Sequence, residues 1–395
     1  MESESLILVV NPGSASRKYS LFAGGQKKVS INFEFEDAKV IGKVEFAGEK
    51  HSINYEDPNL NAVSRYILPL LHEHKIINDA DILSVIGIRV VAPSDSFAKD
   101  RLLTDEVVAE LSTLQQKAPL HITTVLTEIQ QFKTLFPDIP IIAISDSSFH
   151  SKKPIWACYY GIDTTLAEKF GIKRYGYHGV SVGSVIKILQ EAGSLKSKTI
   201  VCHLGSGSSI TAVLDGKSVE TTMGYSPLEG LIMASRSGNI DISAALAIKR
   251  ELQLSDDGLE QYLNEQSGLL GISGSSNDIR QLLTSEEQGN ERARLALDLF
   301  VYRVQQAIGQ MVASMNGVDC LVFTATIGER SAVIRGRIIE KLGYLGFEND
   351  KDVNEKTFEP SEITNIASYS RKPILVVPTD EAAEIARRAE QYIQG

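Results

Sequence analysis

Two patterns of apolar residues occur along the chain, and together they predict a mixed α/β protein. Short runs of Val, Ile and Leu bounded by Gly, Pro or Asp are typical of buried strands. They occupy residues 6–10, 84–91, 140–145, 199–202, 321–324 and 374–377. We interpret residues 31–46 and 51–55 as strands of an antiparallel meander, and residues 18–22 and 210–214 as the second strands of tight hairpins.

Helical spacing, with apolar residues three and four positions apart, fills much of the remaining chain. The longest such segment covers residues 291–315. The other predicted helices are 60–75, 104–114, 123–133, 180–191, 240–253, 257–265, 279–283, 332–341 and 381–392. A chain of 395 residues exceeds the size of one hydrophobic core, so we expect two domains, packed together because no linker or low-complexity segment separates them.

An internal repeat links the two halves of the chain. The segment from Leu8 to Gly24 aligns with the segment from Ile200 to Gly216 at one constant offset. The matched pairs include Asn11 with His203, Gly13 with Gly205, Ser14 with Ser206 and Ser16 with Ser208. Each copy has the pattern strand, Gly/Ser turn, strand, which suggests a duplicated domain. The alternative is a chance similarity between two Gly/Ser hairpins.

These turns have the composition of phosphate-binding loops. Successive backbone N–H groups of a Gly/Ser turn point into one concavity, and serine hydroxyls add uncharged donors. Lys18 stands where it could place a positive charge beside the first turn. The pattern is not the P-loop, which needs GxxxxGK[ST] before a helix. Most Gly/Ser turns only reverse the chain, so the duplication is what favours a phosphate site.

Composition narrows the possible partners and the compartment. The net charge of −10 argues against a nucleic-acid surface, although a few arginines in a cleft can still attract a small anion. Cys158, Cys202 and Cys320 lie in apolar settings without metal-ligand spacing, and we interpret them as reduced thiols. The acidic start and the lack of an apolar run of about 20 residues predict a soluble, cytoplasmic protein that does not enter a membrane.

Motifs spread along the whole chain occur in a characteristic order. They are Asn11-Pro-Gly-Ser-Ala-Ser-Arg-Lys18, Arg89-Val-Val, Ala118-Pro-Leu-His121, Ser145-Asp-Ser-Ser-Phe-His150, Arg174-Tyr-Gly-Tyr-His-Gly179, Cys202-His-Leu-Gly-Ser-Gly-Ser-Ser209, Met223-Gly-Tyr-Ser-Pro-Leu-Glu-Gly230, Ser273-Gly-Ser-Ser-Asn-Asp-Ile-Arg280, Val322-Phe-Thr-Ala-Thr-Ile-Gly-Glu329 and Pro378-Thr-Asp-Glu381. In this order they resemble the acetate kinase family, within the sugar-kinase, Hsp70 and actin fold group.

The resemblance implies two duplicated actin-like (ribonuclease H-like) domains with an active-site cleft between them. The first domain would comprise residues 1–148 and a returning C-terminal helix, 380–395. The second, 149–379, would carry the nucleotide site and the interface of a homodimer. The implied reaction is reversible, Mg²⁺-dependent (or Mn²⁺-dependent) phosphoryl transfer between ATP and acetate or another short-chain carboxylate, giving acetyl phosphate and ADP.

The resemblance also assigns roles to individual residues. Arg89, Asp146, His178 and Arg236 match catalytic positions, and a guanidinium can offset the charge of a transferring phosphoryl group. For either arginine the alternative is a structural salt bridge. Asn11, Asp146 and Glu381 match the metal site, since Mg²⁺ binds through oxygen ligands. For Glu381 the alternative is an acid favoured at a helix start by the macrodipole.

The remaining site residues fall into a substrate group and a phosphate and nucleotide group. Arg89, Val91, Leu120, Tyr177 and Pro227 match the pocket for acetate and its methyl group. The family usually has Phe where Tyr177 stands, and the Tyr177 hydroxyl would either need a partner within the acyl pocket or point to solvent. The phosphate and nucleotide positions are Ser14, Ser16, Lys18, His203, Gly205, Ser206, Gly207, Asp278, Ile279, Arg280, Thr326, Gly328 and Arg330.

Departures from the family pattern lie mostly in the supporting residues. The family's Gly-Ile-Gly-Glu-Asn reads Thr326-Ile-Gly-Glu-Arg330 here, which places a β-branched side chain and a cation beside the expected nucleotide. Two alternatives therefore stand beside an ATP-dependent kinase. One is a kinase that uses pyrophosphate or another polyphosphate as the donor, and the other is a non-catalytic relative that binds a metabolite.

Overall fold

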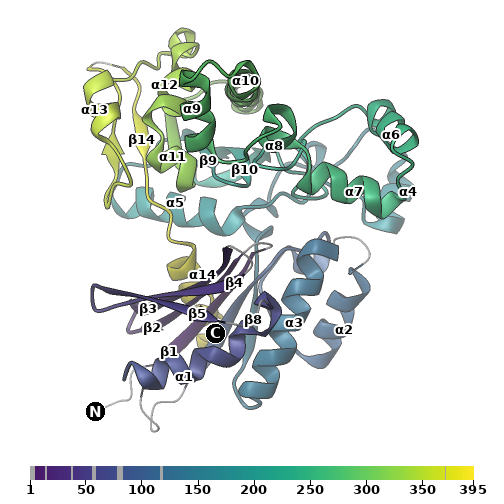
Figure 1. Cartoon of the computed structure of the whole chain (residues 1–395), viewed down its shortest axis with the longest axis vertical. Coiled ribbons are helices and arrows are strands. Elements are labelled where there is room, and N and C mark those ends of the chain that lie inside the picture. Colours follow the sequence, from purple (N-terminus) through teal and green to yellow (C-terminus); the bar gives the residue numbers. More distant parts are fainter. Residues whose placement is uncertain are drawn as a thin grey trace. The chain divides into compact units, whose positions relative to one another are not determined.

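The computed structural model describes residues 5–13, 16–36, 39–55, 59–77, 83–115, 119–369 and 371–395. The chain packs as two compact units, each built on one sheet (Figure 1). Unit 1 comprises Met1–Ser148 and Asp380–Gly395, and unit 2 comprises Phe149–Thr379.

The sheet of unit 1 has the strand order β5-β4-β3-β2-β1-β6-β8-β7. β1 is antiparallel to β2 and parallel to β6, and β6 is parallel to β8. The carboxyl ends of β1, β6 and β8 therefore lie at the same edge of the sheet. The strands are β1 (Leu6–Pro12), β2 (Ser16–Ala23), β3 (Gln26–Glu36), β4 (Lys39–Phe46), β5 (Glu49–Tyr55), β6 (Leu83–Val90), β7 (Arg101–Leu102) and β8 (Ile141–Ser145).

The sheet of unit 2 has the strand order β11-β10-β9-β12-β14-β13. β9 is antiparallel to β10 and parallel to β12, and β12 is parallel to β14. The strands are β9 (Lys198–Leu204), β10 (Ser208–Leu214), β11 (Lys217–Thr221), β12 (Cys320–Thr324), β13 (Thr364–Asn365) and β14 (Ile374–Val376). The order β3-β2-β1-β6-β8 of unit 1 thus recurs as β11-β10-β9-β12-β14, so the predicted duplication is confirmed.

The two hairpins are not exact copies. In the first hairpin Asn11 pairs with Lys18, whereas in the second His203 pairs with Ser209. The constant offset of the sequence repeat would instead place Ile210 opposite His203. The turn of the second hairpin is one residue shorter. Each residue of β10 therefore lies on the opposite face of the sheet from the residue of β2 with which the sequence repeat aligns it.

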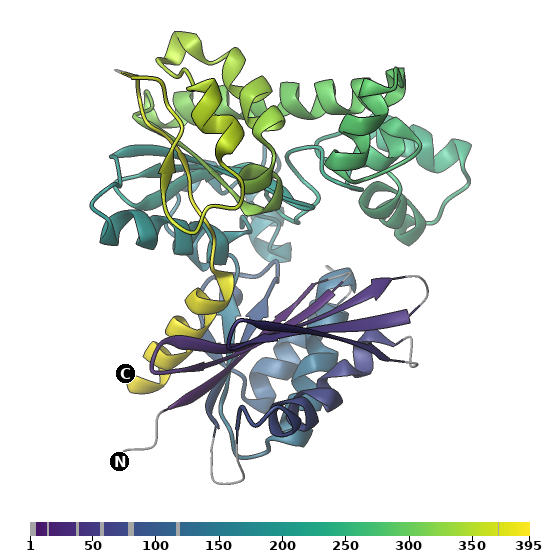
Figure 2. The same cartoon turned by 60° about the vertical axis from the view of Figure 1, so that its left-hand side comes forward.

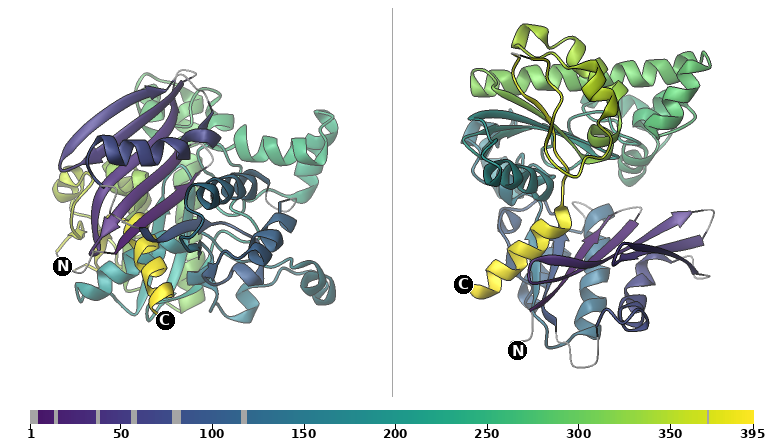
Figure 3. Two further views of the ribbon diagram at one scale, coloured as in Figure 1. Left: turned by 90° about the horizontal axis from the view of Figure 1, so that it is seen from below. Right: turned by 90° about the vertical axis from the view of Figure 1, so that its left-hand side faces the viewer.

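Helices cover both faces of the first sheet. The C-terminal helix α14 (Glu381–Gln394) packs directly on β6, since a Cβ added to Gly87 would lie 2.9 Å from Ile385 and 3.0 Å from Ala389 (Figure 3). The other helices of unit 1 are η1 (Leu60–Tyr66), α1 (Ile67–Glu73), η2 (Asp95–Phe97), α2 (Asp105–Thr113), α3 (Pro119–Leu135) and, beginning at its end, η3 (Ser148–His150).

The single helix predicted over residues 60–75 is wrong. The segment is a 3₁₀ helix, η1, followed by the short α-helix α1. Pro69 lies in the first turn of α1, and a proline has no N–H to donate and clashes with the carbonyl four residues earlier. An α-helix therefore begins just before Pro69 rather than running through it.

Helices of unit 2 lie on both faces of its sheet, and the 25-residue α10 crosses one face (Figure 2). The short helices among them, such as α4, α8, α11 and α13, were not predicted, because six or seven residues are too few to show a helical repeat. The elements are η4 (Ile155–Ala157), α4 (Thr164–Phe170), α5 (Gly179–Glu191), α6 (Ile242–Glu251), α7 (Asp256–Glu265), α8 (Gly268–Ser273), α9 (Ile279–Glu287), α10 (Glu291–Met315), α11 (Ala325–Arg330), α12 (Ala332–Glu340), η5 (Gly343–Leu345) and α13 (Lys351–Lys356).

Alternate residues of the central strands of unit 2 pack into two separate hydrophobic cores, one on each face of the sheet. Ile200 and Cys202 of β9 pack with Phe300 of α10, whereas Val201 packs with Val185 of α5 on the opposite face. This division is the two-residue periodicity expected for a strand that is buried on both sides.

A buried arginine ties the helices that follow β12 together. Arg335 of α12 is 0% exposed. Its guanidinium donates to the backbone oxygens of Gly328, Glu329, Asn354 and Thr357 and to the side-chain oxygen of Asn354, at 2.7–3.0 Å. Carbonyl dipoles rather than a carboxylate thus stabilise this charge, and α11, α12 and α13 are held around one side chain.

Candidate active site

Four polar side chains meet at the carboxyl edge of the unit 1 sheet. Asn11 ends β1, Arg89 lies near the end of β6, Asp146 follows β8, and Glu381 begins α14. Arg89 donates to Asp146 (3.0 Å) and to the Asn11 amide oxygen (3.3 Å), and the Asn11 amide nitrogen donates to Glu381 (2.8 Å). Residues up to 370 positions apart in sequence therefore form one hydrogen-bonded cluster.

This cluster keeps its arginine charged. Burial alone would lower the pKa of the Arg89 guanidinium, but the charges of Asp146 and Glu381 outweigh that effect and raise its pKa. Asp146 is 1% exposed, so Arg89 is also the cation that compensates a buried carboxylate. The Nε atom of Arg89 is buried and makes no hydrogen bond to the residues described here, which leaves a donor for a substrate oxygen.

The cluster fits the chemistry of a magnesium site. Within the described residues no group of three or more His, Cys, Asp or Glu side chains could hold a metal. Mg²⁺, however, commonly binds through one or two carboxylates and keeps several waters. The carboxylates of Asp146 and Glu381 and the amide oxygen of Asn11 supply hard oxygen ligands of this kind.

The first Gly/Ser hairpin is held by hydrogen bonds from Arg17, a residue that the sequence motifs did not identify as part of the site. Arg17 is 3% exposed and donates to the carbonyl of Gly13 and, at 3.2 Å, to that of Ser16, while its Nε lies 3.3 Å from Glu128 of α3. Lys18 is exposed and lies opposite Asn11 in the hairpin. Ser14 lies outside the described residues.

The second hairpin is surrounded by cationic and neutral donors of unit 2. A Cβ added to Gly207 would lie 3.1 Å from Nε2 of His178 and 3.5 Å from a terminal nitrogen of Arg236. A Cβ added to Gly205 would lie 3.9 Å from Nε2 of His203. The structure therefore brings three of the predicted residues together around the predicted phosphate turn.

His178, which faces this turn, has a left-handed backbone conformation. His178 has a φ of 61° and stands directly before α5. A left-handed conformation is uncommon for a residue with a Cβ and is often found at functional sites. Gly176, two residues earlier, has a φ of 86° and packs so closely that an added Cβ would lie 2.7 Å from the side chain of Thr221 and 2.9 Å from that of His150.

A cavity of about 670 Å³ opens beside the second hairpin. This volume suits a small-molecule ligand, since such sites measure about 300–1,000 Å³. The hairpin residues Gly205 and Ser206 line one part of it, and Phe358, which is 63% exposed, is the one aromatic residue in its described lining. The other predicted nucleotide residues that line it are Asp278, Ile279, Arg280, Thr326 and Arg330.

Two charged residues predicted at this cavity already have partners. The guanidinium of Arg280 bonds to Asp278, which lowers the pKa of that carboxyl. Arg330 pairs with Glu359. Gly328 is buried in α11 and does not line the cavity; a Cβ added to it would lie 3.4 Å from the backbone carbon of Phe323 and 3.7 Å from the backbone oxygen of Cys202. The glycine lets α11 approach the sheet, which sequence reasoning did not foresee.

The residues predicted for the acyl pocket are distributed over both units. Val91 belongs to unit 1, while Tyr177 and Pro227 belong to unit 2, and all three are buried. The side chain of Leu120 lies outside the described part of the chain. Tyr177 is 1% exposed and its hydroxyl donates to the backbone oxygen of Tyr225 at 2.7 Å, so the alternative in which this hydroxyl points to solvent is wrong.

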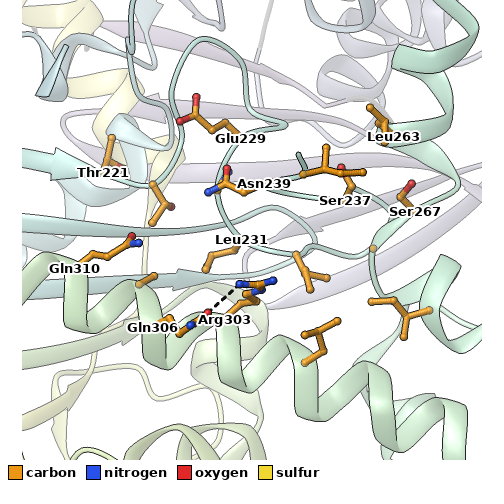
Figure 4. Close-up of a pocket in the computed structure, with 18 of the residues that line it drawn as sticks. Thr221, Glu229, Leu231, Ser237, Asn239, Leu263, Ser267, Arg303, Gln306 and Gln310 are labelled. Carbon is orange, nitrogen blue, oxygen red and sulfur yellow. Dashed lines mark hydrogen bonds between the residues drawn. The ribbon is translucent and has the colours of Figure 1, made fainter. Parts of the chain in front are cut away.

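A second cavity of unit 2, of about 710 Å³, corresponds to no predicted residue. Figure 4 shows that it lies along α10, from which Arg303, Gln306 and Gln310 project, and that Asn239 and Ser267 approach from the opposite side. Arg303 donates to Gln306 at 3.0 Å. The lining residues come from segments far apart in the sequence and carry no motif, so sequence patterns could not indicate this cavity.

Duplicated α/β units, each with a strand–turn–strand hairpin in its sheet, define the class of protein as a two-domain, actin-like phosphotransferase. The chain belongs to the Acetokinase family, whose profile matches residues 6–387. The enzymes of this family transfer a phosphoryl group to a carboxyl group. In the described residues no helix is long and apolar enough to span a membrane.

Individual relatives match over almost their full length. The acetate kinase of Clostridium botulinum (strain Langeland) is 38% identical over 393 residues, which is 98% of each chain. A propionate kinase structure from Francisella tularensis superposes with a TM-score of 0.89 at 35% identity, covering 98% of this chain and 99% of its own. The acetate kinase structure from Porphyromonas gingivalis has a TM-score of 0.87 at 30% identity, covering 98% and 100%.

A double-mutant cycle tests the coupling in the unit 1 cluster. Arg89→Ala should lower the free energy of unfolding by about 3–5 kcal/mol, because it leaves the buried Asp146 carboxylate without its cation. Adding Asp146→Ala should recover part of this loss, since the variant then buries no charge at this position. Urea unfolding of the two single variants and the double variant measures the coupling, and strictly additive losses would refute it.

Proposed function

We propose that this protein is an acetate kinase that transfers the terminal phosphoryl group of ATP to acetate, or to a near homologue, and gives acetyl phosphate and ADP. The observation that carries the proposal is the position of the second hairpin. Gly207 faces His178 and Arg236, while Gly205 and Ser206 line the cavity of about 670 Å³. A phosphate turn thus stands between charge-stabilising donors and a cavity of nucleotide size.

Residues of unit 2 hold the donor. The backbone N–H groups and serine hydroxyls of the second hairpin bind the phosphates, and Arg236 offsets the negative charge that spreads over the transferring group. His178 donates a hydrogen bond to the same oxygens. The apolar residues Ile279, Leu283 and Phe358 cover the base.

Residues of unit 1 bind the carboxylate of the acceptor and would hold the metal. Arg89 binds a carboxylate or phosphoryl oxygen through its Nε–H group, which makes no hydrogen bond within the cluster. Asp146, Glu381 and Asn11 would hold Mg²⁺, which when bound neutralises charge on the donor phosphates. An acetate oxygen attacks the terminal phosphorus in line, the bond to the ADP oxygen breaks, and no covalent enzyme intermediate is needed.

We also propose a cytoplasmic location, in keeping with three cysteines that form no disulfide.

Substitution of the two arginines tests this assignment. Arg89→Ala and Arg236→Ala should each lower kcat by about a hundredfold or more, because each removes a fixed positive charge from the reacting group. A hydroxamate assay for the acyl phosphate measures turnover with acetate, propionate and butyrate. Arg337→Ala is the matched control, since Arg337 pairs with Glu286 outside the site. Near-normal turnover in both site variants would overturn the proposal, and absence of turnover in the unmodified protein would favour the non-catalytic alternative.

The choice of phosphoryl donor depends on the apolar end of the cavity. Thr326 and Arg330 replace a glycine and an asparagine of the family pattern. Neither replacement closes the cavity, because Arg330 is paired with Glu359 and a volume of about 670 Å³ remains beside Thr326. These observations favour a nucleoside triphosphate over pyrophosphate.

Phe358→Ala should therefore raise KM for ATP and for GTP by about tenfold, because stacking on an aromatic ring contributes about 1–3 kcal/mol and tolerates any base. KM for pyrophosphate, if it is used at all, should not change. Phe358→Trp preserves the aromatic face and should keep KM near its original value. Equal KM values for ATP in the original and the Ala protein would remove Phe358 from the site.

We propose that the protein is a homodimer formed through unit 2. Three large hydrophobic side chains of this unit are strongly exposed and are the proposed contact residues: Ile155 (68%), Trp156 (80%) and Ile242 (77%). Helix α6, which carries Ile242, also contributes Ile248 to the cavity along α10 shown in Figure 4. Exposed apolar groups of this kind mark interaction surfaces.

Trp156 is the only tryptophan of the chain, so its emission tests whether the proposed interface covers it. Its emission should shift to longer wavelength on dilution, because dissociation would return the ring to water. Ile242→Glu should give the long-wavelength emission at every concentration and a monomeric sedimentation coefficient. Tyr369→Glu is the control at another exposed hydrophobic position. A monomeric mass at micromolar concentration would contradict the dimer.

A further inference from the structure

Three buried histidines of unit 2 share one contact, a serine hydroxyl at the Nδ1 atom. Each serine is itself buried, and the hydroxyl oxygen lies within hydrogen-bond distance of the ring nitrogen. The pairs are His150 with Ser218 (2.8 Å), His178 with Ser209 (3.0 Å) and His203 with Ser181 (2.7 Å). In a neutral imidazole one nitrogen donates and the other accepts, so the direction of each contact decides where the proton lies.

The direction is determined by chemistry at His150. Its Nε2 lies 2.9 Å from the backbone oxygen of Tyr177, and a carbonyl oxygen can only accept. Nε2 of His150 therefore carries the proton, and a neutral ring accepts the Ser218 hydroxyl at Nδ1. This ring is a reference for the other two.

Nε2 of both other rings faces the second hairpin. The Gly207 Cβ position lies 3.1 Å from Nε2 of His178, and the Gly205 Cβ position lies 3.9 Å from Nε2 of His203. A phosphoryl oxygen bound at the hairpin would be repelled by a lone pair on Nε2 and attracted by an N–H. The two rings are stacked with their centroids 4.0 Å apart, a separation that disfavours a positive charge on both.

A longer chain of hydroxyls stands behind His203. The Ser181 hydroxyl also lies 3.0 Å from the hydroxyl of Thr379. Thr379 is fixed in turn, because its backbone N–H donates to Glu329 at 3.3 Å, and Glu329 accepts the N–H of Ala325 at 2.8 Å. If the Thr379 hydroxyl donates to Ser181, the single Ser181 proton is directed to Nδ1 of His203.

We propose that Ser209, Ser181 and Thr379 are positioning residues that fix His178 and His203 as neutral rings with the proton on Nε2, so that two imidazole N–H groups donate to phosphoryl oxygens at the second hairpin. This proposal rests on the proposed function for its ligand. It goes beyond that function because it assigns the proton positions and the residues that set them.

Proton positions can be measured without any turnover. The chain has seven histidines, so a protein labelled with ¹⁵N only in histidine gives a spectrum that single substitutions such as His203→Asn can assign. Long-range ¹H–¹⁵N correlation at about pH 8.5, where an unperturbed imidazole is neutral, distinguishes the two proton positions. We expect His150, His178 and His203 to show the same pattern, with the proton on Nε2. A proton on Nδ1 of His203 or His178 would overturn the proposal.

The serine variants separate the two rings. Ser181→Ala should alter the ¹⁵N pattern of His203 and leave that of His178 unchanged, whereas Ser209→Ala should do the reverse. A pattern unchanged by either substitution would show that the serine does not set the proton position.

Kinetics then test the catalytic consequence. Thr379→Val removes the hydroxyl but keeps the shape of the side chain, and it should lower kcat by about tenfold with KM for acetate unchanged. Thr379→Ser restores a hydroxyl and should restore kcat. Equal kcat in the Val and Ser variants would overturn the role of Thr379. A protein with no kinase activity would refute the proposed function alone, because the ¹⁵N patterns would still decide the proton positions.

Discussion

The architecture depends on one strand in each unit that pairs antiparallel with the next strand and parallel with a later one. β1 and β9 occupy this position, and each is buried at the centre of its sheet. A Gly/Ser turn between two such strands can point successive backbone N–H groups into one concavity. The parallel neighbours must then end at the same edge, so their last side chains are gathered beside the turn. The polar residues of each unit follow from this geometry.

The two units carry chemically different side chains at the matching ends of β1 and β9. Unit 1 places Asn11 at the end of β1, where it bridges a guanidinium and a carboxylate. Unit 2 places His203 at the matching point of β9, stacked on a second imidazole. The register difference of one residue contributes to this divergence, because it sets Ser209, rather than the apolar Ile210, opposite His203. Duplication therefore supplied the frame, and a shorter turn changed which side chains face the ligand.

Much of this frame could be read from the sequence, because buried strands and the Gly/Ser turns leave local signals. The repeat predicted both hairpins, and the predicted α10 has the same bounds as the observed helix. What could not be read depends on tertiary contacts. Nothing local marks Ser181 as the partner of His203 or Arg17 as the support of the first turn. The contact of Gly328 with the backbone of Phe323 and Cys202 also depends on the tertiary fold, since the sequence motif points only to the nucleotide.

Arg335 has a consequence for how the wall of the nucleotide cavity opens. Its charge is satisfied only while the carbonyls of Gly328, Glu329, Asn354 and Thr357 all converge on it. Withdrawal of any one of these segments leaves a buried cation short of acceptors, which raises the free energy of every partly open state. Residues 325–357 should consequently behave as one cooperative unit of local unfolding, and their amide protons should exchange with solvent through a single shared opening.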